Sequence, residues 1–191
     1  MLVTVVGLGA LGSNLLFVGR SLDIEWRIID FDHIEYKNTQ SQFHTMMSLG
    51  KNKALSLQRT LKSLFKINVA DTRPTRLTSD NAKQLLGGAD LVIDCLDNAE
   101  SRHVLANYCR DNGITRLHSA LSEDGTVAVI QWDDDFVIAQ ESEVGAATCE
   151  AGENLPMIMA SASYLALALQ QHVEHGHKRS YQVLPTGAMR T

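Results

Sequence analysis

A glycine-rich segment near the N-terminus constrains the fold of this chain more than any other feature. It follows an apolar run at residues 2–6, typical of a buried parallel strand, and precedes helical character at residues 10–22. The segment consists of Gly7, Leu8, Gly9, Ala10, Leu11 and Gly12. In such a unit one glycine permits the tight turn, one lets a phosphate approach the backbone and one lets helix and strand pack closely. Because the helix start favours an anion, the segment predicts a nucleotide-binding loop and not a chance glycine turn.

Strands and helices alternate along the first 120 residues. Further strands are expected at residues 26–30, 67–72, 90–94 and 115–120, and helices at residues 52–65, 79–86 and 99–111. Such alternation is typical of a mostly parallel sheet with helices on both faces, joined by right-handed crossovers. The sequence therefore predicts an α/β, Rossmann-like, doubly wound fold.

The pattern changes after residue 120. Residues 125–132 and 136–140 alternate around three consecutive aspartates, which predicts a hairpin, and residues 141–153 are polar and indicate a loop. A long apolar helix is expected at 155–173, packed on the sheet or on a second subunit, with an edge strand at 179–184. The fold thus gains a C-terminal antiparallel extension and a long final helix. No linker or repeat divides the chain, so residues 1–191 are expected to form one domain.

Composition narrows the classes of function. The net charge is -5 and no long basic run is present, which argues against a nucleic-acid partner. No stretch reaches the roughly 18 apolar residues that a membrane span needs, and the N-terminal run is not a secretory signal. The three cysteines, Cys95, Cys109 and Cys149, are widely spaced, as reduced thiols are. We therefore expect a cytoplasmic protein.

An acidic pair closes the second strand. Asp30 lies about 20 residues past the glycine loop, where a carboxylate holds ribose hydroxyls, and Asp32 follows it. Both also suit a turn at a strand end. The glycine loop and Asp30 are compatible with NAD as well as ATP, so the identity of the nucleotide depends on residues further along.

Five stretches in order resemble the ThiF/MoeB-type family, the bacterial relatives of ubiquitin-activating enzymes. They are Ile29-Asp30-Phe31-Asp32 with Asn38 and Gln42; Leu49-Gly50-Lys51-Asn52-Lys53-Ala54; Asp94-Cys95-Leu96-Asp97-Asn98 with Arg102; Gly125 and the strand after it; and Thr148-Cys149-Glu150-Ala151-Gly152. The resemblance implies an adenylyltransferase that binds Mg-ATP and a ubiquitin-like or sulfur-carrier protein. The glycine-tail carboxylate of that carrier would attack the α-phosphate, giving an acyl-adenylate and pyrophosphate. It also implies a homodimer or heterodimer.

The resemblance assigns roles to individual residues. Lys53 matches the family's phosphate-contacting lysine, although a lysine in a helix is usually solvated at the surface. Asp97 matches the Mg²⁺-binding aspartate and lies at the strand end where open α/β sheets bind ligands, but it would also suit a helix N-cap. Asn38 matches a residue near the phosphates, or else supports its own loop backbone. Asp30 matches the ribose-binding aspartate, and Arg102 is expected to hold the Asp97 loop in place.

Cys149 lies in the loop where several family members carry a cysteine that accepts the acyl group as a thioester. A thiolate is a good acyl acceptor when its pKa is lowered, yet no His or Lys is near Cys149 in the sequence. A covalent role and an inert loop thiol therefore both stay open.

The sequence departs from the family in three places. Ser41 stands where the family places an arginine on the ATP phosphates, the arginine-bearing helix before the first strand is missing, and no C-x-x-C motif for structural zinc occurs. Losing one charge-stabilising donor costs about 3 kcal/mol of barrier, so these differences allow a catalytically degenerate subunit that binds nucleotide or protein as an alternative. An NAD-dependent oxidoreductase is a second alternative, and a tRNA-modifying dehydratase within the same family a third.

Overall fold

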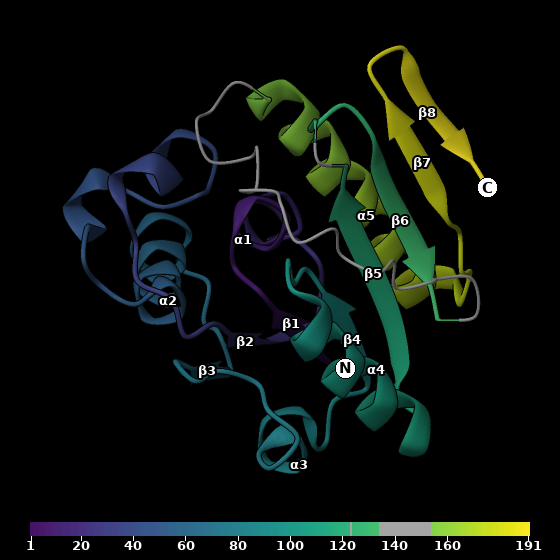
Figure 1. The fold of residues 1–191 in the computed structure, drawn as a ribbon, viewed down its shortest axis with the longest axis horizontal. Helices are drawn as coiled ribbons and strands as arrows, with labels where there is room; N and C mark the ends of the chain where they lie inside the picture. Colours follow the sequence, from purple (N-terminus) through teal and green to yellow (C-terminus); the bar gives the residue numbers. More distant parts are fainter. Residues whose placement is uncertain (123, 134–153) are drawn as a thin grey trace.

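The computed structural model describes residues 1–122, 124–133 and 154–191. Within these ranges an eight-stranded sheet has the order β3-β2-β1-β4-β5-β6-β7-β8, as Figure 1 shows. The strands from β3 to β5 are parallel, and the strands from β5 to β8 pair antiparallel. Their bounds are β1 Leu2–Val6, β2 Glu25–Ile29, β3 Asp71–Arg73, β4 Leu91–Asp94, β5 Thr115–Leu121, β6 Ala128–Trp132, β7 Tyr181–Leu184 and β8 Gly187–Arg190. The expected mostly parallel sheet with an antiparallel extension is confirmed.

Helices cover both faces of the sheet. One hydrophobic core joins the sheet to α1, α2 and α5, and a second joins the other face to α3 and α4. The helices are α1 Ala10–Val18, α2 Lys53–Phe65, α3 Ala82–Leu86, α4 Ala99–Asp111 and α5 Leu155–His175, with short 3-10 helices η1 Tyr36–Gln40 and η2 Met46–Ser48. In Figure 1, α5 lies beside α1 and along the antiparallel strands, and it contacts both. The long final helix is therefore buried against the sheet of its own chain.

Strand β1 is the centre of the parallel region. It pairs with β2 on one side and β4 on the other, and its three valines, Val3, Val5 and Val6, are buried. Because side chains alternate along a strand, Val3 and Val5 enter the first core while Val6 enters the second. A strand buried on both faces needs the continuous apolar run that the sequence shows.

Two elements differ from the sequence-based bounds by four residues at one end, and the helix expected at 79–86 begins three residues later, as α3. The first helix ends at Val18, not at residue 22, because Gly19 and the polar residues after it form a turn. Residues 67–72 were expected as a strand, but Lys66 adopts the left-handed conformation at the end of α2, and the Ile67 N–H bonds back to the Leu61 carbonyl. Residue 67 therefore closes the helix, and β3 begins only at Asp71.

The C-terminal strands also correct one expectation. Residues 179–184 were expected at the sheet edge, yet β7 pairs with β6 on one side and β8 on the other, so β8 forms the edge. A two-residue turn between Leu184 and Gly187 brings β8 back along β7. The strand at 125–132 is confirmed as β6, whereas the expected strand 136–140 and loop 141–153 lie outside the described residues. Among the described helices, none combines the length and apolar character required to cross a membrane.

The turn after β1 depends on two glycines, Gly7 and Gly12, that lie very close to backbone carbonyl oxygens. Gly7 has φ +91°, and a β-carbon there would lie 2.6 Å from the Cys95 carbonyl oxygen. A β-carbon on Gly12 would lie 1.9 Å from the Gly7 carbonyl oxygen. By contrast, the nearest atom to a β-carbon on Gly9 would be the Gln42 side-chain nitrogen at 4.0 Å. Gly7 and Gly12 are thus required by packing, whereas Gly9 leaves space beside the loop.

We predict that Gly12→Ala lowers the free energy of unfolding by about 2 kcal/mol or more, because the added methyl meets a backbone oxygen that cannot move without displacing α1 or β1. Denaturant unfolding followed by circular dichroism measures the change. Gly9→Ala is the control and should change the stability by less than about 1 kcal/mol. Equal stabilities for Gly12→Ala and the unmodified protein would contradict this packing.

Candidate functional site

The glycine loop lies at the carboxyl edge of the parallel strands. It follows β1 directly, and its Gly7 N–H bonds to the Ile29 carbonyl at the end of β2. The loop leads into α1, whose first N–H groups have no partner within the helix. A β-carbon on Gly9, beside these groups, would meet only the Gln42 side-chain nitrogen, at 4.0 Å. The geometry is that of an anion-binding loop, and Gly9, Ala10 and Leu11 are the residues whose backbone would face a phosphate.

Both backbone polar groups of Leu8 are held by side chains. Its N–H donates to Asp30 Oδ2 at 2.6 Å, and its carbonyl lies 2.9 Å from His44 Nε2. Burial lowers the pKa of His44 from 6.5 to about 4, so the imidazole is neutral at neutral pH. Because a carbonyl only accepts, Nε2 carries the proton and donates. His44 was missed by sequence reasoning, since it is 36 positions from Leu8 and no local pattern marks it.

Asp30 is 8% exposed and serves as a hub at the end of β2. Its Oδ1 accepts from the Asp32 N–H at 2.8 Å, while Oδ2 accepts from Leu8. Burial raises the pKa of Asp30, and the nearby Lys53 charge with the two N–H donors opposes that rise. Each carboxylate oxygen still has a second lone pair, so Asp30 retains the acceptors that a ribose hydroxyl needs.

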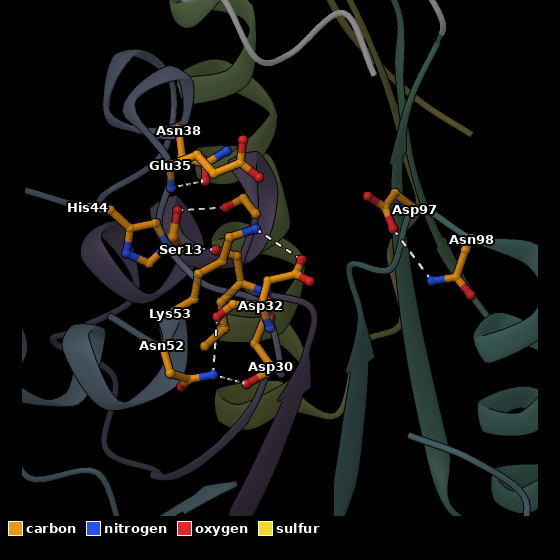
Figure 2. A network of polar contacts seen from close by, with 12 residues as sticks. Ser13, Asp30, Asp32, Glu35, Asn38, His44, Asn52, Lys53, Asp97 and Asn98 are labelled. Carbon is orange, nitrogen blue, oxygen red and sulfur yellow. Dashed lines mark hydrogen bonds and ion pairs between the residues drawn. The ribbon is translucent and has the colours of Figure 1, made fainter. Parts of the chain in front are cut away.

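Lys53 is buried at the start of α2, with its side chain 9% exposed. Its Nζ lies 3.2 Å from Asp32 Oδ2, and its backbone N–H donates to the Asp32 carbonyl at 2.8 Å. The alternative of a solvated surface lysine is therefore wrong. Asp32 is half-exposed, and its carboxylate holds the Lys53 ammonium close to Asp30, as Figure 2 shows.

Asn52 fixes the connection between β2 and α2. Its Nδ2 donates to the carbonyls of Asp30 at 3.0 Å and Asp32 at 3.1 Å, and its Oδ1 accepts from the Leu55 N–H as the α2 N-cap. Sequence reasoning placed Asn52 at a helix start but not its contacts with the acidic pair. An N-cap asparagine is the local signal that marks it. Through these bonds the position of Lys53 follows that of the acidic pair.

Asn38 supports its own loop. It is 3% exposed, and its Oδ1 accepts from the Glu35 N–H at 2.9 Å, closing the η1 turn beside the site in Figure 2. Asn38 therefore supports its own loop backbone, which is one of the two roles expected from the sequence. A contact between Asn38 and phosphates stays a prediction. Ser41 follows η1 and is 1% exposed, with its carbonyl accepting from Asn14 Nδ2 at 2.9 Å. The segment after β2 is thus docked on α1.

Asp97 lies beyond the end of β4. The Cys95 N–H bonds to the Val6 carbonyl, so the β4 loop begins beside the glycine loop. Asp97 is exposed, and Figure 2 shows its carboxylate on the side that faces the group around Asp30 and Lys53. The N-cap of α4 is Asn98, whose Oδ1 accepts from the Ser101 N–H at 2.9 Å. The alternative of Asp97 as the helix cap is therefore wrong.

Arg102 holds the loop as expected, because its guanidinium donates to the Leu96 carbonyl, with Nε at 2.8 Å. Mg²⁺ prefers oxygen ligands and is often bound by one or two carboxylates together with substrate phosphates. A single exposed carboxylate opposite an anion-binding loop fits that pattern. Within the described ranges, no group of three or more His, Cys, Asp or Glu side chains could hold a metal by itself.

Two of the three cysteines, Cys95 and Cys109, lie within the described residues. Cys109 is buried in α4, and burial raises its pKa to about 12. Burial also raises the pKa of Cys95, which follows β4 directly. Both are therefore inert thiols at neutral pH. Cys149 lies outside the described residues.

Fold and site together define a Rossmann-like α/β domain with a glycine loop before α1, a buried lysine and an exposed aspartate after β4. Residues 1–173 match the ThiF family, and the chain belongs to that family. The adenylyltransferase and sulfurtransferase UBA4 of Candida albicans is 34% identical over 133 residues, covering 68% of this chain and 30% of that protein. The sulfur carrier protein adenylyltransferase of Thermus thermophilus is 33% identical over 135 residues, covering 66% and 48%. The chain thus spans less than half the length of these curated relatives.

Solved structures agree on the fold. The structure of E. coli MccB with AMPCPP and MccA superimposes with a TM-score of 0.77 at 17% identity, covering 99% of this chain and 62% of that chain. At such low identity the similarity concerns the fold alone. The similarity covers both the parallel and the antiparallel parts of the sheet.

We predict that His44 makes the stability of the protein depend on pH. The pKa of His44 is about 4 in the folded protein and 6.5 as a free side chain, so the unfolded chain binds a proton first as the pH falls. The contribution of His44 is therefore fully present above pH 6.5 and is lost between pH 6.5 and about 4. The loss amounts to roughly 3 kcal/mol.

The measurement is denaturant unfolding at several pH values for the unmodified protein and for His44→Gln, whose amide nitrogen replaces Nε2 as donor. The difference between the two isolates His44, because Asp30, whose raised pKa acts in the opposite direction, is present in both. His44→Gln should show the flatter profile. Parallel profiles would contradict a buried neutral imidazole at this position.

Proposed function

We propose that this chain is an ATP-dependent adenylyltransferase that activates the C-terminal glycine carboxylate of a ubiquitin-like or sulfur-carrier protein. The observation that carries the proposal is the buried Lys53 at the carboxyl edge of the sheet, held beside the glycine loop by Asp32 and Asn52. A buried ammonium with a half-exposed acidic partner is available to a phosphate that enters the site. The curated relatives are named as adenylyltransferases, which supports the same chemistry.

We assign each residue a role according to its place in the site. Backbone N–H groups from Gly9 to Leu11 would hold phosphate oxygens, Asp30 would accept from the ribose hydroxyls, and Lys53 would neutralise phosphate charge. Asp97 would bind Mg²⁺ on the opposite side of the phosphates. The carrier carboxylate attacks the α-phosphorus and pyrophosphate leaves. Most of the rate enhancement in such a reaction comes from alignment and charge neutralisation.

The arrangement favours ATP over NAD. A dehydrogenase needs the glycine loop and Asp30, but it has no need for a buried lysine beside the phosphates or for an exposed aspartate at the end of β4. These two side chains are the ones that a magnesium–triphosphate requires. We further propose that the protein acts in the cytoplasm, on the ground of its dispersed cysteines.

We predict that Lys53→Met weakens Mg-ATP binding by about tenfold to a hundredfold, because a charge-assisted contact is lost, and that Asp97→Asn removes most of the Mg²⁺ dependence. Isothermal calorimetry with ATP, with and without Mg²⁺, measures both effects. Lys62→Met, on the exposed face of α2, and Asp111→Asn, at the exposed end of α4, are matched controls and should bind like the unmodified protein. Unchanged Mg-ATP affinity in Lys53→Met and Asp97→Asn, or tight binding of NAD, would overturn the assignment.

A degenerate partner subunit is the second candidate. Ser41 is buried against Asn14, so this position offers no cation to the phosphates. In that case the chain would work as one half of a heterodimer whose partner supplies the charge, whereas an active enzyme would work alone or as a homodimer. AMP release by the purified chain with ATP and a glycine-terminated carrier separates the two candidates.

Cys149 gives a separate prediction. If its thiolate attacks the acyl carbon of the adenylate, AMP leaves and a thioester joins the carrier to Cys149. A non-reducing gel should then show a thiol-labile adduct with the unmodified protein and none with Cys149→Ser. Pyrophosphate release should persist in the variant, because adenylation precedes the thiol step. An adduct that survives in Cys149→Ser, or no adduct in either protein, would assign Cys149 as an inert thiol.

A further inference from the structure

A buried histidine–carboxylate pair lies behind the Asp97 loop. Asp94 is the last residue of β4, and His118 is its partner in register on β5. His118 Nδ1 lies 2.9 Å from Asp94 Oδ2, with side chains 1% and 0% exposed. Neither residue faces the space beside the glycine loop, because Asp94 shares the side of β4 on which Val92 packs against α4.

Asp94 connects this pair to the site. Its second oxygen, Oδ1, accepts from the Leu96 N–H at 3.0 Å. The Leu96 carbonyl accepts from Arg102. Leu96 is therefore held by a carboxylate at one end and a guanidinium at the other. The next residue along the chain is Asp97, whose orientation depends on the Leu96 peptide.

The contact between His118 and Asp94 places a neutral ring against a buried carboxyl group. Burial lowers the pKa of His118, although its contact with Asp94 opposes that effect, and the charges of Arg116 and Arg102 add to the lowering. The ring is thus neutral at neutral pH. Its Nδ1 lies 2.9 Å from Asp94 Oδ2, so the imidazole is held against the carboxyl group. A fully buried carboxyl group needs polar partners, because an unsatisfied one is strongly unfavourable.

We infer that His118 is a positioning residue for the magnesium-binding loop. By its 2.9 Å contact with Asp94 Oδ2 it fixes the carboxyl group whose other oxygen accepts from the Leu96 N–H, and it thereby restrains the backbone that leads to Asp97. This inference rests on the proposed function, in which Asp97 binds Mg²⁺. Residues that orient a metal ligand from behind commonly change metal affinity or activity by about tenfold to a hundredfold when they are replaced.

Four variants test the inference. His118→Leu removes both ring nitrogens, His118→Asn places an amide nitrogen near the Nδ1 position, and His118→Gln places it near Nε2. His103→Leu makes the same replacement on the exposed face of α4 and is the control. Two quantities are measured for each: the hydrogen-exchange rate of the Leu96 amide by NMR, and the Mg²⁺ concentration at half-maximal ATP binding by calorimetry.

His118→Leu should speed Leu96 exchange and raise the Mg²⁺ midpoint by about tenfold or more. His118→Asn should restore both values to within about threefold of the unmodified protein, and His103→Leu should match it. If His118→Leu does not fold, His118→Gln against His118→Asn makes the same comparison. Recovery by His118→Asn alone supports the role of Nδ1.

Normal Leu96 exchange and an unchanged Mg²⁺ midpoint in the folded variant that lacks the Nδ1 contact would overturn the inference. Equal losses in His118→Asn and His118→Gln would also overturn it, by showing a packing role only. A failure of the proposed function can be distinguished from a failure of this inference. If the proposed function is wrong, the unmodified protein itself shows no Mg²⁺-dependent ATP binding, whatever the Leu96 exchange rates are.

Discussion

The close approach of α1 to the turn after β1 is the constraint on which the site depends. Gly12 passes so near the Gly7 carbonyl that no side chain fits between them, and Gly7 in turn lies close to the Cys95 carbonyl after β4. The start of α1 is therefore placed at the carboxyl edge, between the ends of β2 and β4. The sheet order reverses direction at β1, since β2 and β3 lie to one side and β4 to the other. Open α/β sheets bind ligands at such a point, and Asp30 and Asp97 come from the two strands that flank it.

Buried polar contacts hold this edge together. Asp30 bonds to the backbone of the glycine loop and of its own turn, Asn52 ties that turn to α2, and Lys53 follows. On the other side, Asp94 and Arg102 hold the loop before Asp97. On both sides a carboxyl group at a strand end accepts backbone N–H groups of the adjoining loops, from Leu8 and Asp32 at Asp30 and from Leu96 at Asp94, and holds those loops in place.

Local patterns predicted the parts of the structure that depend on neighbours in the chain. The glycine loop, the alternation of strands and helices and the strand-end position of Asp97 are all properties of short segments. Contacts between distant segments left no such pattern, so the bond of His44 to Leu8 and the Asp94–His118 pair required the structure. The cap of α4 was ambiguous because Asp97 and Asn98 are adjacent and both suit that role. Strand β8 was missed because its four residues show no apolar alternation and its turn alone sets its pairing.

The restraint of both backbone polar groups of Leu8 has a consequence for the thermodynamics of binding. A glycine-rich loop with few contacts would lose backbone freedom when a ligand orders it, and that loss would reduce the affinity. Here Asp30 and His44 already fix the peptide in the middle of the loop, and β1 and α1 fix its two ends. The conformational entropy has been lost during folding, so a nucleotide meets a preorganised surface and association should require little rearrangement of the backbone.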